Sequence, residues 1–136
     1  MIFVDSSAWF AVAFAGDRHN AVAKRLIKDA ERIVTTDHVL VESWLLIKSR
    51  FDHYRAESFW RNFRGQSIDV EIVTKDDIER AWVIGEKFND QTFSIVDRTS
   101  FVVMERLGIE RAISFDNDFV IYRYGPNRDR AFEVLR

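Results

Sequence analysis

The stretch MIFVDSS (residues 1–7) sets the expectation for the fold, because an apolar run leads directly into an aspartate and two serines. Such a run predicts a short buried strand with Asp5 at its carboxyl end. In open α/β sheets, ligands bind at the carboxyl ends of the strands. Asp5 is therefore a candidate site residue, and other acids that reach the same edge of the sheet would join it.

The composition limits the classes of protein that need to be considered. A chain of 136 residues, 47% of them hydrophobic, is long enough for one domain spanning residues 1–136 and too short for two of ordinary size. The absence of cysteine excludes disulfides and thiolate metal sites. The longest apolar run, residues 8–15, is far shorter than the roughly 20 residues of a membrane span, which predicts a soluble, cytoplasmic protein without membrane association. The net charge of −2 permits an anionic substrate without demanding one.

Apolar spacing and capping residues predict strands that alternate with helices. Strands are expected at residues 1–4, 32–36, 68–73 and 111–115, with a further edge strand at 120–124. Helices are expected at residues 7–14, 17–28, 37–50, 52–64, 74–87 and 94–107, with Asp17 and Asp37 as two of the caps. This order predicts an α/β fold with a mostly parallel central sheet of four or five strands, covered by helices on both faces.

Four acids stand where such a fold could bring them together: Asp5, Glu42, Asp97 and Asp116. Asp5 and Asp116 each follow a predicted strand, so both would project from one edge if those strands are neighbours. Glu42 lies in a helix that is apolar nearly all round, which predicts burial on every side. A carboxylate there is costly unless it is paired or bound to a metal, and its only polar neighbour along the helix is His38.

Each acid also has a structural interpretation that the sequence leaves open. Asp5 and Asp97 could cap helices, and Asp116 could form an Asx turn. Taken as a set, however, several neighbouring carboxylates repel one another, and a hard divalent cation relieves that repulsion. Oxygen ligands suit Mg²⁺ or Mn²⁺, and such a site can activate water and stabilise the charge that develops on a phosphodiester.

The order of these motifs resembles that of the PIN-domain ribonucleases, and most of all the VapC-type toxins of toxin-antitoxin pairs. The resemblance rests on the opening strand with Asp5, on Glu42, on SIVD (residues 94–97) and on AISFDNDF (residues 112–119). It covers essentially the whole chain. It implies an α/β/α sandwich forming a single PIN domain over residues 1–136, and an endoribonuclease that hydrolyses RNA phosphodiester bonds with Mg²⁺ or Mn²⁺.

The resemblance also assigns roles by motif position. Asp5, Glu42, Asp97 and Asp116 would be catalytic, with the metal held by Asp5, Asp97 and Asp116 and by Glu42 directly or through water. Three further residues would support the site: Ser6, Ser114 and Asp118. Whether Asp116 or Asp118 faces the metal stays open, because both belong to the same turn.

The resemblance implies three partners: RNA, a cognate antitoxin that inhibits the enzyme, and a second copy of the chain in a homodimer. Residues 50–64 interleave arginines with aromatic residues, a combination that holds single-stranded RNA. Arg55, Arg61 and Arg123 are the candidate substrate contacts. The aromatic members at helical spacing, Phe59, Trp60 and Phe63, more strongly favour a core or a partner-binding groove.

Two alternative functions remain. A PIN fold retained only as a protein-binding module typically loses one or more acids, whereas this chain keeps all four. An aspartate-based, phosphatase-like enzyme would use Asp5 as a nucleophile and usually has a second aspartate two residues later, where this chain has Ser7.

Overall fold

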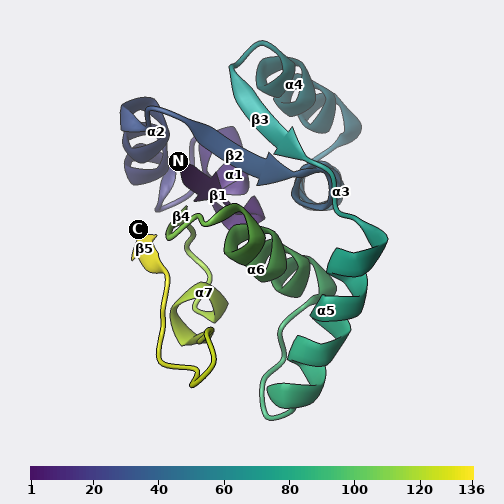
Figure 1. Cartoon of the computed structure of the whole chain (residues 1–136). Helices are drawn as coiled ribbons and strands as arrows, with labels where there is room; N and C mark the ends of the chain where they lie inside the picture. Colours follow the sequence, from purple (N-terminus) through teal and green to yellow (C-terminus); the bar gives the residue numbers. More distant parts are fainter.

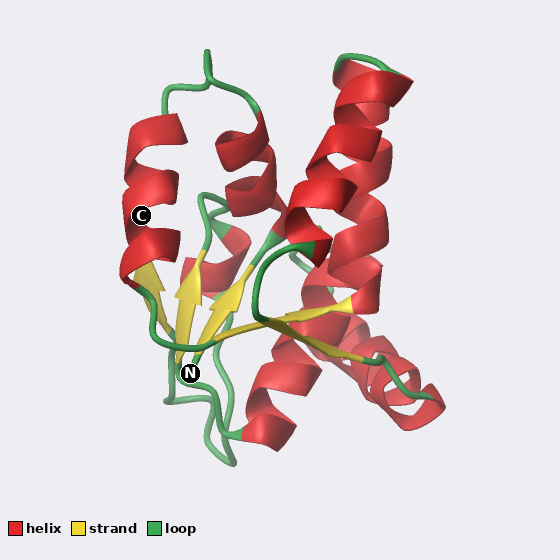
Figure 2. Ribbon diagram, turned by 90° about the horizontal axis from the view of Figure 1, so that it is seen from above, coloured by secondary structure: helices red, strands yellow, loops and turns green.

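The computed structural model describes all 136 residues and contains a five-stranded, fully parallel sheet with the order β3-β2-β1-β4-β5 (Figure 1). The strands are β1 (Ile2–Val4), β2 (Ile33–Thr36), β3 (Ile68–Glu71), β4 (Arg111–Ile113) and β5 (Glu133–Leu135). The helices are α1 (Ser6–Ala13), α2 (Asn20–Asp29), α3 (Asp37–Arg50), α4 (His53–Arg64), α5 (Lys75–Lys87), α6 (Ile95–Leu107) and α7 (Asp118–Ile121). Helices lie on both faces of the twisted sheet (Figure 2), so the predicted α/β/α sandwich is confirmed.

The strand order reverses between β1 and β4, and this reversal places the candidate site. From β1 the chain builds outward through β2 to β3 on one side and returns to β4 and β5 on the other. Val4 is in register with Ile113, and the Asp5 N–H donates to the Ile113 carbonyl at 3.1 Å. The two strands therefore end level, at the kind of switch point where α/β sheets bind ligands. Strands β1 and β4 are neighbours, so the condition for Asp5 and Asp116 to project from one edge is met.

Aromatic side chains build the core on both sides of the sheet. On one side, Phe3 stacks on Phe119, with ring centroids 6.3 Å apart. On the other, Trp9 of α1 packs against Phe59 and Phe63 of α4 at 6.3 and 5.3 Å. Phe59 and Phe63 are thus core residues, whereas Trp60 between them keeps 43% of its surface exposed. None of the helices combines the length and apolar character needed to cross a membrane.

Two of the predicted caps are wrong. Asp17 does not begin α2, because its Oδ1 accepts from the His19 N–H and so closes a bend before the helix. Thr36, not Asp37, caps α3, while the Asp37 carboxylate accepts from the Val73 N–H at 2.9 Å. In both places the aspartate binds a backbone amide outside the helix that it was expected to cap.

Two larger expectations are also corrected. Helix α3 is not buried on every side, since Val41 and Leu45 are 56% and 55% exposed. Residues 120–124 do not form the predicted strand, because the first of them belong to the short helix α7. The buried residues Phe119 and Tyr122 lie three positions apart, which is the spacing of one helical face and not of a strand. The edge strand is instead β5, which pairs with β4.

An ion-pair network fixes the hairpin of α5 and α6. The Arg106 guanidinium donates to both oxygens of the buried Asp77 carboxylate, at 2.9 and 2.8 Å, and to Glu71 of β3 at 2.8 Å. Asp77 also completes a capping box with Thr74 at the start of α5. Because α6 carries Asp97, this network fixes the position of one of the candidate site acids relative to the sheet.

We expect Asp77→Asn to lower the free energy of unfolding by about 2 kcal/mol at pH 7. The Arg106 hydrogen bonds lower the pKa of Asp77 from 3.8 to about 2, which corresponds to roughly 2 kcal/mol. A depressed pKa in the folded state stabilises the protein above the unfolded value near 4, and this stabilisation is lost as the pH falls through 2. Urea unfolding of both proteins should therefore give a difference that shrinks between pH 4 and pH 2. A difference that does not change with pH would contradict this account.

Candidate active site

Asp5 is the buried centre of the site, with only 1% of its surface exposed. Its Oδ2 accepts hydrogen bonds from the hydroxyls of Ser7 at 2.8 Å and Ser114 at 2.9 Å. The same two hydroxyl oxygens accept from the backbone of the loop after β4: Ser7 from the Phe115 N–H at 2.9 Å and Ser114 from the Asp116 N–H at 3.1 Å. Asp5 is thus fixed to the loop that carries Asp116.

The helix-capping and site interpretations of these acids prove compatible. Asp5 caps α1 by accepting from the Ser7 N–H. The Oδ2 of Asp97 accepts from the Ser94 N–H at 3.1 Å, and the Ser94 Oγ accepts from the Asp97 N–H at 3.0 Å, which completes a capping box. Asp116 forms the Asx turn, because its Oδ1 accepts from the Asp118 N–H at 2.9 Å. One oxygen of Asp97 and one of Asp116 is held by backbone, and each second oxygen is left for the site.

Three carboxylates converge: Asp97, Asp116 and Asp118 offer oxygens that all lie within 4.8 Å of one another. Burial, a hydrogen bond shared with the Asp118 carboxyl, and the charges of Asp5 and Asp116 together raise the pKa of Asp97 to about 8. Burial and the neighbouring charges of Asp118 and Asp5 also raise the pKa of Asp116.

Burial likewise raises the pKa of Asp5, although its serine hydrogen bonds oppose this effect. The charged forms of these acids are therefore unfavourable together unless a cation joins them. The donor set fits a hard divalent cation, which takes carboxylate oxygens and is favoured by several negative charges in close proximity.

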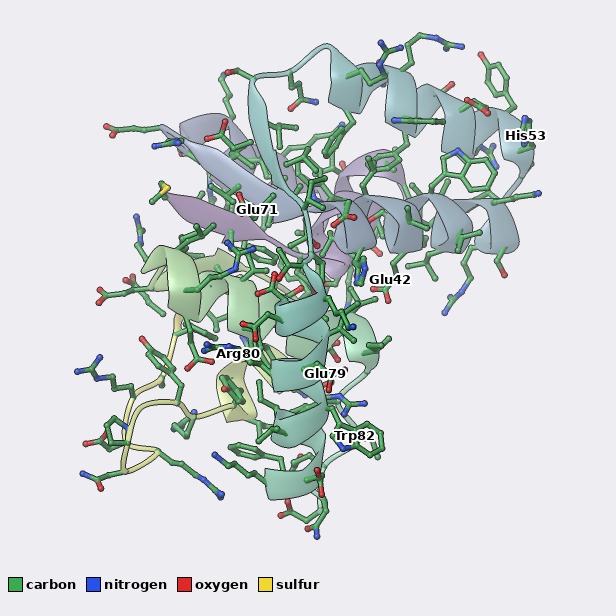
Figure 3. All side chains as sticks on the ribbon, turned by 45° about the vertical axis from the view of Figure 1, so that its right-hand side comes forward. Glu42, His53, Glu71, Glu79, Arg80 and Trp82 are labelled. Carbon is green, nitrogen blue, oxygen red and sulfur yellow. The ribbon has the colours of Figure 1, made fainter.

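Glu42 is linked to Asp5 through a serine rather than grouped with the three converging carboxylates. It is half-buried near the start of α3 (Figure 3) and accepts a hydrogen bond from Ser6 Oγ, which in turn lies 3.4 Å from Asp5 Oδ1. His38, the polar neighbour of Glu42 along the helix, has its Nδ1 3.5 Å from Thr99 Oγ1 on α6.

Ser7 is the site residue that the sequence reasoning did not assign. Ser6 and Ser114 were expected to support the site, and both contact its acids. Ser7 connects Asp5 to the loop after β4 in the same way as Ser114 does, through one hydrogen bond to Asp5 and one from a backbone N–H. Its position in the first turn after Asp5 could have indicated this role, because an aspartate that caps a helix faces the side chains of that turn.

The candidate substrate arginines lie in two different places. Arg55 and Arg61 are exposed on α4, which packs against α3 on the far side of β3 from the acidic cluster (Figure 1). Arg123 follows α7, and its Nη1 donates to the carbonyls of residues 120, 121 and 122 at the end of that helix. The structure therefore does not gather these three arginines around the acids.

A parallel α/β/α sandwich with acids from β1, α6 and the loop after β4 at its switch point defines a class of protein. The PIN domain family model matches residues 2–124, and the chain belongs to this family. The 23S rRNA-specific endonuclease VapC20, found in two strains of Mycobacterium tuberculosis, is 41% identical over 120 residues, which are 88% of this chain and 92% of the relative.

Solved structures agree with this assignment. The crystal structure of Mycobacterium tuberculosis VapC20, described as a toxin that cleaves the sarcin-ricin loop, superposes with a TM-score of 0.83 at 39% identity and covers 88% of this chain and 93% of that one. A toxin-antitoxin complex from Klebsiella pneumoniae gives a TM-score of 0.63 at 14% identity over 89% of this chain and 92% of that one, which shows a shared fold. Within the PIN family, the chain is thus of the VapC type.

We expect Asp97→Asn to stabilise the metal-free protein in alkaline solution. Because the pKa of Asp97 is raised to about 8 in the folded state, only the unfolded state ionises between pH 4 and pH 8, so the wild type loses stability as the pH rises through this window. The asparagine has no such cost. In chelator, the variant should be more stable than the wild type near pH 8, by on the order of a few kcal/mol, and the difference should shrink toward pH 4.

Urea unfolding across this pH range, with and without added Mg²⁺, measures both parts of the expectation. Added Mg²⁺ should reverse the order of the two stabilities, because the wild type offers the ion one more carboxylate than the variant does. A variant that is less stable than the wild type in chelator at pH 8 would rule out repulsion among these acids.

Proposed function

We propose that this protein is a metal-dependent endoribonuclease that hydrolyses RNA phosphodiester bonds and acts as the toxin of a toxin-antitoxin pair. The observation that carries the proposal is the convergence of Asp97, Asp116 and Asp118 beside the buried Asp5. The 41% identical relative is named for cleavage of 23S rRNA, and we extend that substrate to this chain.

We assign metal binding to Asp5, Asp97 and Asp116, with Glu42 acting directly or through water, and Mg²⁺ or Mn²⁺ as the ion. A divalent ion held there would neutralise the acids and stabilise negative charge on the phosphate during displacement. Of the two acids in the turn we assign Asp116 as the ligand, since the Asp118 N–H holds only its Oδ1, and we assign Asp118 an orienting role. A nearby carboxylate would accept the proton that the attacking water releases.

The chain's own hydrogen bonds keep these acids oriented before substrate arrives. Ser7 and Ser114 occupy Oδ2 of Asp5, so its Oδ1 is the oxygen that can face an ion. Ser6 links this carboxylate to Glu42. Such supporting hydrogen bonds typically change metal affinity or activity by about 10- to 100-fold when removed.

We further propose that residues 1–136 form a single domain that acts on RNA in the cytoplasm. In support, β5 lies beyond the residues that match the family model and still completes the sheet by pairing with β4. We also propose RNA contacts for Arg55, Arg61 and Arg123, of which the first two are exposed.

Two exposed apolar surfaces support the proposed protein partners. The first, the α3–α4 groove, has a volume of about 360 Å³ and only apolar lining residues: Leu40, Val41, Trp44, Leu45 and Trp60. We assign this groove to an apolar segment of the cognate antitoxin. The second surface contains Ile78 and Trp82 of α5 and Ile95 of α6, which are 39%, 66% and 54% exposed. We assign it to a homodimer.

We expect Asp5→Asn to abolish RNA cleavage, by at least about 100-fold, while leaving the fold intact. The asparagine preserves the shape and can still accept from Ser7 and Ser114, but it removes the charge that an ion requires. The assay uses a panel of RNAs that includes 23S rRNA, in Mg²⁺ or Mn²⁺, with chelator and Asp97→Asn alongside and the exposed Asp90→Asn as a matched control. Cleavage that survives chelator or both substitutions would refute the metal mechanism, and no cleavage of any RNA would favour a protein-binding module.

A glutamate placed in one apolar surface should disrupt only the partner that we assign to that surface. Sedimentation should show that Trp82→Glu converts a dimer into a monomer, while Leu45→Glu leaves the dimer intact. In cells that co-express the cognate antitoxin, Leu45→Glu should restore growth arrest, because a charge in the α3–α4 groove weakens antitoxin binding. If Leu45→Glu stays fully inhibited, the antitoxin does not occupy this groove.

A further inference from the structure

A second, basic cavity lies between α5, α6 and the segment that follows α7. It has a volume of about 360 Å³, and five cationic side chains line it against one carboxylate, that of Glu105. The five cations are Arg80, Lys87, Arg106, Arg123 and Arg128. Figure 3 shows Arg80 projecting from α5 on the side opposite Trp82, so this cavity and the proposed dimer surface occupy different sides of α5.

Most of these cations are not paired with a carboxylate inside the protein. Lys87 and Arg128 have no carboxylate partner, and the only hydrogen bonds of Arg123 go to backbone carbonyls. Glu105 accepts a hydrogen bond from the Tyr122 hydroxyl at 2.8 Å. The remaining two cations, at positions 80 and 106, pair with acids of α5 and β3 outside the cavity lining. The cavity therefore favours an anionic ligand.

Aromatic rings complete the cavity and orient one of its free cations. The Arg128 guanidinium lies over the Phe88 ring, 5.1 Å from its centroid. Arg128 is also the one non-glycine residue with a positive φ, 51°, so the turn holds it in an uncommon backbone conformation. Tyr122 and Tyr124 line the same space. Arginine beside aromatic rings is the combination that binds the phosphates and bases of nucleic acid strands.

Two elements connect this cavity to the acidic cluster. Helix α6 carries Asp97 in the cluster and Glu105 in the cavity, which corresponds to a rise of about 12 Å along the helix. Helix α7 begins at Asp118 in the cluster, and Arg123 in the cavity follows its end. A single RNA strand of a few nucleotides can span this distance.

We propose that the basic cavity binds a phosphodiester group of the RNA substrate, a few nucleotides away from the bond that is cut. This inference rests on the proposed ribonuclease function and adds a second contact that positions the strand. The shared chemistry is a phosphate, which could also come from a free phosphate or a mononucleotide.

The test measures RNA binding, which does not depend on cleavage. In the inactive Asp5→Asn background, a fluorescent 23S rRNA fragment is titrated with the double variant Lys87→Ala/Arg128→Ala. The matched control is Lys24→Ala/Arg25→Ala, which removes the same two charges from the exposed face of α2. We expect the cavity variant to bind roughly tenfold more weakly at low salt and to reduce the slope of log affinity against log salt by about 1, with the control unchanged.

The variant Glu105→Gln tests whether a more positive cavity binds RNA more tightly. It removes the one carboxylate of the cavity while its amide oxygen can still accept from Tyr122, so RNA affinity should rise about two- to threefold. Circular dichroism and unfolding curves identify any variant that has lost its fold, and a loss of RNA affinity in such a variant does not count as support.

Several outcomes would overturn the inference. The inference fails if the cavity variant binds RNA as tightly as the control variant does. It also fails if the cavity variant loses only the binding of inorganic phosphate or a mononucleotide, which would indicate a small-anion site. A change in the oligomeric state alone would overturn it as well. Failure of the proposed ribonuclease function can be told apart from failure of this inference, because the wild type would then cleave no RNA. Weaker RNA binding by the cavity variant would support the second contact even then.

Discussion

The burial of the Asp5 carboxylate under two serine hydroxyls is the interaction on which the rest of the site depends. An ionised carboxylate is expensive to remove from water, and the hydroxyls of Ser7 and Ser114 offset part of that cost. The same hydroxyls accept from the backbone after β4, so one buried carboxyl group orders both sides of the switch point. The strand, the first turn of α1 and the loop with Asp116 thus form a single unit.

The carboxylates of the site repel one another, and packing and hydrogen bonds hold them together despite this repulsion. Asp97 and Asp116 both have raised pKa values because burial and like charges disfavour their ionised forms. They remain in place because a helix cap and an Asx turn each hold one oxygen. The ion pair of Arg106 with Asp77 lies far along α6 from the acids and secures the helix against β3 and α5. The protein is therefore pre-organised for a cation at the expense of its stability without one.

Much of the fold was predictable because its causes are local. Helices α5 and α6 lie where expected, because neighbouring residues specify their ends: the capping boxes at Thr74 and Ser94, and Gly108 in its left-handed conformation after α6. Burial was harder to predict. Helix α3 has apolar residues all round, but its exposed face becomes evident only once α1, α4 and α6 are seen to cover the other faces. The fifth strand was misplaced because a three-residue strand carries almost no periodicity of its own.

By itself, the sequence determined the parallel architecture, because strands alternate with helices along the chain, and it selected the acids that could meet at one edge of the sheet. Tertiary structure decided how each acid is used. It joined Glu42 to Asp5 through Ser6, brought Asp118 into the cluster with Asp97 and Asp116, and gathered arginines from α5, α6 and the C-terminal segment around one cavity. These outcomes depend on side chains far apart in the chain, whose distances are set by packing. The opening strand indicated the edge of the sheet at which acids could gather, and the fold determined which of their oxygens the backbone holds.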